Sequence, residues 1–287
     1  MNYFITGASG FIGKALIKKL LLIEKNKIFA LSRRKNNNLK LDNRNIKWIK
    51  GNLKSDVKEY LKKTDVLIHL ATKFDNNPSS KIYETNLIDS LNFFGKAKQY
   101  GVKKYFVAGS GFEHGNSKEY ILPLSVLKPT THYQISKAIF NIKICNWAKK
   151  NMFNLTYMKI FQAYGPGENK NRLYPQIVKS AKEDKKLSIN RYAKYIIRDF
   201  IELDKIINDI IFQTHNNKGV NISNCCSGKK MSVLNFSKIK WKEFSLKESK
   251  IITKHAIKPV PISNFGLRKI NNIDNIPYTF NKLYHAK

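Results

Sequence analysis

A glycine-rich turn near the amino terminus limits the fold of this chain more than any other feature. The segment TGASGFIG, residues 6–13, directly follows a short apolar stretch and precedes an amphipathic one. This order predicts a strand, a tight turn and a helix. Gly7 would allow the turn, Gly10 a close approach to a pyrophosphate, and Gly13 close packing of the helix on the strand. With the free N–H groups of the helix N-terminus, the pattern predicts a dinucleotide site.

The segments that follow alternate between strand-like and helix-like patterns. Strands are expected at 2–6, 27–32, 46–50, 66–70, 104–108 and 155–161, and helices at 13–23, 56–62, 81–99 and 133–150. Strict alternation predicts an α/β fold, a Rossmann-like doubly wound parallel sheet with helices on both faces. Ligands of such a sheet bind at the carboxyl ends of its strands.

The pattern becomes less regular in the second half of the chain. Residues 1–164 are expected to form the dinucleotide-binding domain, with returns to its sheet near 197–223, at 197–202 and 220–223. Residues 165–196 and 224–287 are expected to form a smaller lobe that binds the substrate.

The charge of the chain is strongly positive, with 53 Lys and Arg against 20 Asp and Glu and a formal net charge of +33. Such a charge could indicate a nucleic-acid or acidic-membrane partner. The excess is mostly Lys, is spread along the chain and accompanies many Asn and Ile residues, which is typical of an AT-rich genome. We therefore expect no nucleic-acid and no membrane partner, although the positive field would help to capture phosphate-bearing ligands.

Apolar runs and cysteines add further expectations. No apolar run approaches the roughly 20 residues that span a bilayer. The first strand begins too early for a signal peptide to precede it. Cys145, Cys225 and Cys226 have no metal-binding spacing and are expected to be reduced thiols. These features predict a cytoplasmic protein without a metal site.

The end of the second expected strand predicts the type of dinucleotide. Ser32, Arg33 and Arg34 stand where an acidic residue would bind the ribose 2′-hydroxyl of NAD. Two guanidinium groups favour the 2′-phosphate of NADP(H), although an exposed basic loop is the alternative. Other residues expected at the cofactor are Ser9, Phe11, Ile12, Asn52, Leu53, Leu70, Ala71 and Thr72.

Three residues predict the chemistry. Tyr133 and Lys137 are four positions apart in an expected helix, so they share a face. The Lys137 ammonium should lower the pKa of the Tyr133 phenol and make it a proton donor near neutral pH. Ser110 follows the fifth expected strand, where its hydroxyl could hold a substrate oxygen. A chance spacing and a simple turn hydroxyl are the alternatives.

Short segments occur along the chain in a characteristic order: TGASGFIG, DVLIHLAT, ETNLIDS, AGSGFEHG, YQISK, FQAYGPG and IRDFIELD. In this order they resemble the extended short-chain dehydrogenases/reductases that modify nucleotide sugars. The resemblance implies that Ser110, Tyr133 and Lys137 are catalytic, that Lys137 also holds the nicotinamide ribose, and that Phe161 lies near the nicotinamide. It implies substrate contacts from Gly111, Phe112, His114, Gln162, Arg172 and Arg198. For His114, a role as an auxiliary acid and a purely structural role in the turn are the alternatives. It also implies a homodimer formed through the helices at 81–99 and 133–150.

Departures from the family pattern narrow the expected reaction. The 4,6-dehydratases carry an acid pair directly after the catalytic hydroxyl, where this chain has Gly111 and Phe112, and Glu113 is one position too far along. The 4-epimerases usually carry an acidic residue where Ser32 and Arg33 stand. The segments GSGFE and KNRLYPQIV most resemble reductases of nucleotide-linked 4-keto-6-deoxyhexoses, such as those making abequose- or fucose-type sugars.

The expected function is therefore NADPH-dependent reduction of the C4 keto group of a CDP- or dTDP-linked 4-keto-6-deoxyhexose, in the synthesis of a surface polysaccharide. A sugar 4-epimerase with bound NAD is the first alternative. A non-enzymatic regulator that senses NADP is the second, and the Tyr133–Lys137 pair argues against it.

Overall fold

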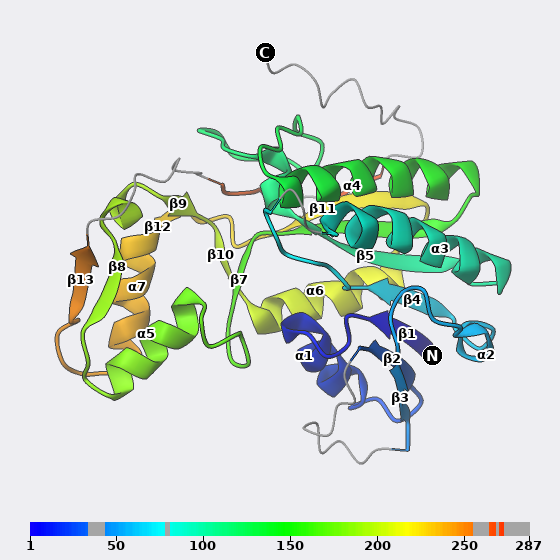
Figure 1. Ribbon diagram of the computed structural model, residues 1–287, viewed down its shortest axis with the longest axis horizontal. Coiled ribbons are helices and arrows are strands. Elements are labelled where there is room, and N and C mark those ends of the chain that lie inside the picture. Colours follow the sequence, from blue (N-terminus) through cyan, green and yellow to red (C-terminus); the bar gives the residue numbers. More distant parts are fainter. Residues whose placement is uncertain (34–43, 78–80, 255–263, 268–269, 273–287) are drawn as a thin grey trace.

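The main sheet has eight strands in the order β14-β11-β6-β5-β4-β1-β2-β3 (Figure 1). The computed structural model describes residues 1–33, 44–77, 81–254, 264–267 and 270–272, so Arg34 lies outside the described residues. The strands are β1 (Asn2–Thr6), β2 (Lys27–Ser32), β3 (Ile46–Lys50), β4 (Val66–His69), β5 (Lys104–Ser110), β6 (Asn154–Ile160), β11 (Val220–Cys225) and β14 (Ile270–Asn272). All pair in parallel except β14, which runs antiparallel to β11. The predicted Rossmann-like doubly wound sheet is confirmed.

Helices cover both faces of this sheet (Figure 1). On one face lie α1 (Phe11–Leu20) and α6 (Leu203–Asn216), and on the other α3 (Ser90–Gln99) and α4 (His132–Lys150), while the short α2 (Lys58–Leu61) follows β3. Side chains of a strand alternate between the two cores. In β1, Phe4 packs with the α3 and α4 side chains, whereas Tyr3 and Ile5 pack with those of α1 and α6.

Helix α3 begins with a π-helical turn, η1 (Glu84–Asp89), where the sequence predicts one regular helix. Asn86 in this turn donates from Nδ2 to the carbonyl of Lys73 (2.9 Å) and to Oγ of Ser136 (3.1 Å). Its Oδ1 accepts from the backbone N–H of Lys73 at 2.7 Å. Asn86 therefore fixes the loop after β4 against helix α4.

A smaller lobe extends from the carboxyl side of the sheet (Figure 1, left). It packs α5 (Leu173–Lys182) and α7 (Val233–Lys242) around the buried side chains of Ile177, Phe236 and Trp241. Its remaining elements are β7 (Gln162–Tyr164), β8 (Leu187–Asn190), β9 (Ile197–Arg198), β10 (Phe200–Glu202), β12 (Met231–Ser232), β13 (Ile251–Lys254), and the 3-10 turn η3 (Arg191–Lys194).

Two details of the predicted domain organisation differ from the structure. Residues 197–202 do not return to the main sheet, because β5 and β11 occupy both sides of β6. Strand β9 instead pairs with β12, and β10 pairs with β7. Conversely, β14 lies within the range expected for the lobe, yet it extends the main sheet beyond β11. Residues 220–223 do return to the main sheet as expected, within β11.

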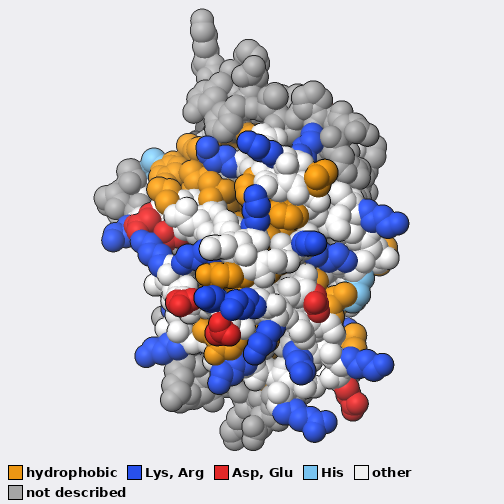
Figure 2. Space-filling view, turned by 90° about the vertical axis from the view of Figure 1, so that its right-hand side faces the viewer, with side chains coloured by type: hydrophobic (Ala, Val, Ile, Leu, Met, Phe, Trp, Pro, Cys, Tyr) orange, Lys and Arg blue, Asp and Glu red, His pale blue; other side chains and the backbone are white. Residues whose placement is uncertain are grey.

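Charged side chains are dispersed over the surface. Figure 2 shows Lys and Arg side chains spread over one face, with hydrophobic and a few acidic side chains between them. Within the described ranges, no helix has the length and apolar character needed to cross a bilayer.

Candidate active site

The glycine-rich turn connects β1 to α1 and requires glycine at two positions. Gly7 has a φ of 67°, and a Cβ there would lie 2.7 Å from the backbone nitrogen of Ala71. A Cβ at Gly13 would lie 2.5 Å from the carbonyl oxygen of Gly7. Among the described residues, no side chain caps the helix at Gly10, so the first N–H groups of α1 can serve an anion. This cradle fits the pyrophosphate of a dinucleotide.

The end of β2 lies directly beside this turn. Ser32 donates from its hydroxyl to the hydroxyl of Ser9 at 2.9 Å, which joins two of the predicted cofactor residues. Arg33 follows with an exposed side chain. The edge therefore presents hydroxyls and a guanidinium near the position that the adenosine ribose takes in this fold.

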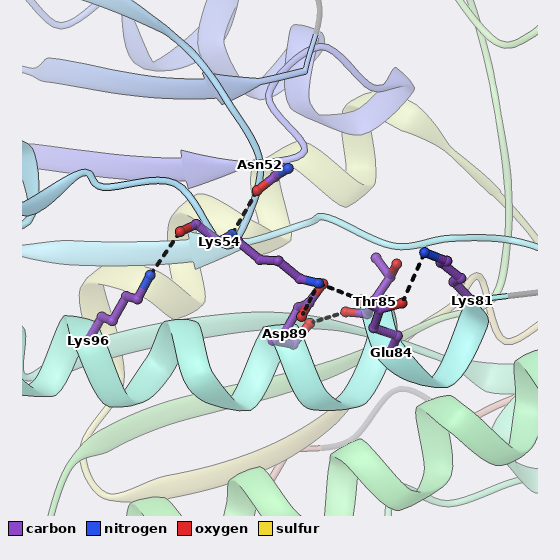
Figure 3. Close-up of polar contacts among 8 residues, drawn as sticks. Asn52, Lys54, Lys81, Glu84, Thr85, Asp89 and Lys96 are labelled. Atoms are coloured by element: carbon purple, nitrogen blue, oxygen red, sulfur yellow. Dashed lines mark hydrogen bonds and ion pairs between the residues drawn. The ribbon is translucent and has the colours of Figure 1, made fainter.

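The loop after β3 carries two further predicted cofactor residues. Asn52 accepts the backbone N–H of Lys54 at 2.8 Å, while the Leu53 side chain is buried in the core beneath α3. Figure 3 shows how Lys54 ties this loop to the π-turn, through ion pairs with Glu84 and Asp89. These bonds fix the loop next to the cofactor edge.

Residues 69–72, at and after the end of β4, lie beside the turn between β1 and α1. The backbone N–H of Ala71 donates to the Thr6 hydroxyl at 3.2 Å, and Thr72 donates to Oδ1 of Asn86 at 3.3 Å. His69 is buried with its Nδ1 2.9 Å from the same Thr6 hydroxyl. Burial, followed by the nearby charge of Lys137, lowers the pKa of His69 to about 3, so it is a neutral structural residue.

The structure brings Ser110, Tyr133 and Lys137 together. Ser110 ends β5, while Tyr133 and Lys137 lie on the first turns of α4. The start of that helix is fixed by a capping box, in which Thr131 and Gln134 each accept a backbone N–H of the other. Lys137 donates from Nζ to the carbonyl of Ala108 at 2.6 Å, on the strand that carries Ser110.

The pKa of Tyr133 differs from the expectation. Burial raises it to about 12, and a hydrogen bond to the Ser110 side chain offsets only part of this. The Lys137 ammonium points to the Ala108 carbonyl, and burial lowers its own pKa to about 8. The prediction that Lys137 lowers the pKa of Tyr133 is therefore wrong for this structure. A phenol with a raised pKa keeps its proton at neutral pH and still has one to donate.

The turn after Ser110 is tightly packed. A Cβ at Gly111 would lie 2.8 Å from the ring of Phe161, which is itself buried. Asn264 donates from Nδ2 to the carbonyl of Gly111 at 2.9 Å. The Arg198 guanidinium lies 5.4 Å from the ring centroid of Phe112. Four predicted site residues are thus neighbours, whereas Asn264 lies outside every recognised segment of the sequence and was missed.

His114 takes a different role from the predicted one. It is 3% exposed, its Nδ1 lies 3.1 Å from the Val126 carbonyl, and its Nε2 lies 3.0 Å from Nζ of Lys159. Both ring nitrogens are used inside the protein. A sugar contact and an auxiliary-acid role are therefore wrong for His114, whereas the alternative of a structural role in the turn agrees, because the short turn after Ser110 directs the ring into the interior.

A loop aromatic that the sequence analysis did not identify lies over the site. The Phe74 ring centroid is 4.7 Å from that of Tyr133, and the Arg172 guanidinium is 5.3 Å from the Phe74 centroid. Through these two contacts Arg172, a predicted substrate residue, lies near Tyr133. Gln162 lies in β7 and is partly exposed. Phe74 could have been identified from the sequence, because it is an aromatic residue in an otherwise polar loop after the fourth strand.

Comparisons with known proteins find a matching family and several relatives. The model of the NAD dependent epimerase/dehydratase family matches residues 3–221. CDP-abequose synthase of Salmonella typhimurium is 27% identical over 230 residues, or 75% of this chain and 71% of that protein. GDP-6-deoxy-D-talose 4-dehydrogenase of Aggregatibacter actinomycetemcomitans is 28% identical over 271 residues, or 89% of this chain and 85% of that protein.

Solved structures have the same fold. UDP-N-acetylglucosamine 4-epimerase from Methanobrevibacter ruminantium superposes with a TM-score of 0.81 at 23% identity, covering 97% of this chain and 92% of that one. dTDP-glucose 4,6-dehydratase from Bacillus anthracis gives a TM-score of 0.81 at 21% identity, covering 93% and 88%. In the part of the chain that the structure describes, no group of three or more His, Cys, Asp or Glu residues could hold a metal ion.

Proposed function

Because the chain belongs to the NAD dependent epimerase/dehydratase family, we propose that it is an oxidoreductase that uses NADPH to reduce the C4 keto group of a nucleotide-linked 4-keto-6-deoxyhexose. The favoured nucleotides are CDP and dTDP. The observation that carries the proposal is the convergence of Ser110, Tyr133 and Lys137 at the carboxyl end of β5.

The cofactor edge supports NADPH. The glycine cradle and the uncapped start of α1 would hold the pyrophosphate, and the end of β2 offers Ser32 and Arg33 to a 2′-phosphate. Lys137 would hold the nicotinamide ribose. When bound, the reduced nicotinamide would supply a hydride for the C4 carbonyl carbon.

The catalytic residues have complementary tasks. Tyr133 carries a proton at neutral pH, because its pKa is raised to about 12, and it would give that proton to the oxygen developing at C4. The Ser110 hydroxyl, whose interaction with the phenol acts to lower the pKa of Tyr133, would hold the same oxygen. The Lys137 ammonium would add positive charge to the site, which would favour the negative charge that develops on this oxygen.

The residues after Ser110 favour reduction without dehydration. Elimination of water from the sugar needs a further acid or base at the substrate, and Gly111 and Phe112 offer none. Glu113 is fully buried and accepts three internal hydrogen bonds, so its carboxylate does not face the substrate.

The test is turnover of CDP- and dTDP-linked 4-keto-6-deoxy sugars with NADPH, followed by NADPH absorbance and product analysis. We expect one NADPH oxidised for each 4-hydroxy sugar formed. Interconversion of 4-hydroxy epimers without NADPH consumption would make the protein a 4-epimerase instead. Tight DNA binding with a steep salt dependence and no turnover would favour a regulator.

The helices α3 and α4 are the proposed dimer surface of a cytoplasmic homodimer, which would act in the synthesis of a surface polysaccharide. Ile88, in the π-turn that opens α3, is 54% exposed and would be covered by the second copy. Light scattering on the purified protein tests the assembly, and a monomer at all concentrations would refute it.

A further inference from the structure

Glu113 is a fully buried carboxylate beneath the turn that carries Ser110. It lies in the 3-10 turn η2 (Gly111–His114) and is 0% exposed. Its Oε1 accepts the backbone N–H of Ser110 at 2.7 Å and the hydroxyl of Tyr157 at 2.7 Å. Its Oε2 accepts from Nδ2 of Asn141 at 2.8 Å. Three donors directed at two oxygens suit the ionised form, which only accepts hydrogen bonds.

These bonds connect the three elements that build the site. Ser110 ends β5, Tyr157 lies on β6, and Asn141 lies on α4, one turn beyond Lys137. A Cβ at Gly109 would lie 2.2 Å from the Tyr157 ring, so glycine at this position lets the ring reach Glu113. One carboxylate therefore links the Ser110 backbone to both β6 and α4.

Two buried lysines belong to the same cluster: the Tyr157 hydroxyl also lies 3.3 Å from the Lys137 carbonyl, and Lys159 Nζ lies 3.0 Å from Nε2 of His114, the residue after Glu113. Lys137 is 3% exposed and Lys159 is 0% exposed, on α4 and β6 respectively. Burial lowers the pKa of each to about 8, and in both cases the negative charge of Glu113 acts in the opposite direction. Burial raises the pKa of Glu113 itself, while the charges of Lys159 and Lys137 and the hydrogen bonds from Ser110 and Tyr157 act in the opposite direction. The other titratable groups of this cluster are His69, His114, Tyr133, Cys145 and Tyr157. Glu113 thus provides the negative charge that two buried cations need.

We propose that Glu113 is a positioning residue, which fixes the Ser110 hydroxyl through the Ser110 backbone and places its carboxyl group in the same buried cluster as Lys137. Its effect on turnover rests on the proposed function, whereas its effect on the charge of Lys137 does not. The substrate does not touch it, so it acts through Ser110 and Lys137.

The first test is a pH titration of Lys137 by carbon NMR of lysine-labelled protein, with the signal assigned by Lys137→Arg. In Glu113→Gln, which keeps the size of the side chain and removes its charge, Lys137 should titrate at a lower pH than in the native protein. Tyr157→Phe, which removes a hydrogen bond and keeps the charge, is the matched control and should leave the titration in place. An unchanged titration in Glu113→Gln would overturn the proposal, whether or not the protein reduces a sugar.

Kinetics test the positioning of Ser110. Glu113→Gln should lower kcat with little change in KM, within the roughly 100-fold loss that a misplaced catalytic group causes. It should also move the basic limb of the pH profile of kcat to lower pH, and Tyr157→Phe should not move it.

If Glu113→Gln does not fold, Glu113→Asp replaces it. That variant keeps the charge but shortens the reach to Ser110, so kcat should fall while the basic limb stays in place. A native kcat in Glu113→Gln or Glu113→Asp would refute the positioning of Ser110. If the native protein itself shows no turnover, only the proposed function is refuted.

Discussion

The ring of Phe74 lies against the ring of Tyr133, with centroids 4.7 Å apart and planes inclined by 54°. Phe74 is 58% exposed, and Arg172 approaches its ring at 5.3 Å. A large exposed aromatic residue beside a proton donor can form a wall for a substrate ring. Phe74→Ala should therefore lower kcat/KM about 3- to 10-fold, since such aromatic contacts contribute about 0.5–1.5 kcal/mol. Phe74→Tyr keeps the ring and should stay close to native. Equal kcat/KM for the alanine variant and the native protein would remove Phe74 from the site.

Loss of the Tyr133 hydroxyl should stop proton donation while the dinucleotide site stays intact. Tyr133→Phe is expected to cut turnover by roughly 10²–10⁴-fold, as for a positioned acid, with NADPH affinity nearly unchanged. The comparison is kcat from steady-state assays against Kd from NADPH fluorescence. Tyr100→Phe, at the end of α3, is the matched control and should behave as native. Native-like turnover in Tyr133→Phe would contradict the assigned role.

Dinucleotide preference should depend on the basic residues after β2. Replacing Arg33 and Arg34 with alanine should weaken NADPH binding by about 10- to 100-fold, because a hydrogen bond to a charged group contributes about 1.5–3 kcal/mol. NADH binding should change little, since NADH has no 2′-phosphate. Calorimetry with both dinucleotides measures this, and Lys19→Ala at the end of α1 controls for the loss of surface charge. Equal losses for the two dinucleotides would refute the 2′-phosphate assignment.

The buried lysines predict a rise of stability with pH. The pKa values of Lys137 and Lys159 are about 8 in the folded protein, below the ordinary 10.5. Between these values the unfolded chain binds more protons, so the free energy of unfolding should increase with pH by up to about 1.4 kcal/mol per unit for each lysine. Cys145, whose pKa burial raises above the ordinary 9.0, acts in the opposite sense from about pH 9, and the buried tyrosines with raised pKa values do so above pH 10. Urea unfolding between pH 8 and 10 checks this. Lys159→Met should reduce the slope, and a slope that falls with pH would contradict the argument.

Two glycines should respond in opposite ways to alanine. Gly13→Ala places a Cβ 2.5 Å from the Gly7 carbonyl and should lower both the melting temperature and dinucleotide affinity. At Gly95, in the exposed part of α3, no atom lies within 4 Å of an added Cβ. Gly95→Ala should therefore stabilise the protein by about 0.5–1 kcal/mol through helix propensity. A neutral effect of Gly13→Ala would show that the helix can move away from the strand.

Local patterns predicted the parts of the fold that depend on nearby residues. The bounds of β1, β2 and β3 agree with the expectation, because β1 and β2 have apolar centres and β3 combines apolar residues with lysines. The approach of Tyr133 and Lys137 to Ser110 also agrees, since helix spacing and parallel order determine it.

The parts that depend on distant residues were not predicted. The pairing of residues 197–202 depends on which sheet edges remain free, and no local period encodes that. The orientation of His114 depends on Lys159, which is 45 positions away. The pKa of Tyr133 depends on its burial, which the folded protein provides and the local sequence does not show. Such effects arise from tertiary packing and outweigh local preference.

The bonds from Asn264 have a consequence for synthesis of the chain. Its Nδ2 donates to the carbonyls of Gly111 and Gly115, 153 and 149 positions earlier in the sequence. On a ribosome, the motifs around Ser110 and Tyr133 emerge long before this partner does. The first strands of the nascent sheet can pair while the turn after Ser110 still lacks its hydrogen bonds from Asn264. A competent catalytic site is therefore expected late in translation, well after the dinucleotide cradle.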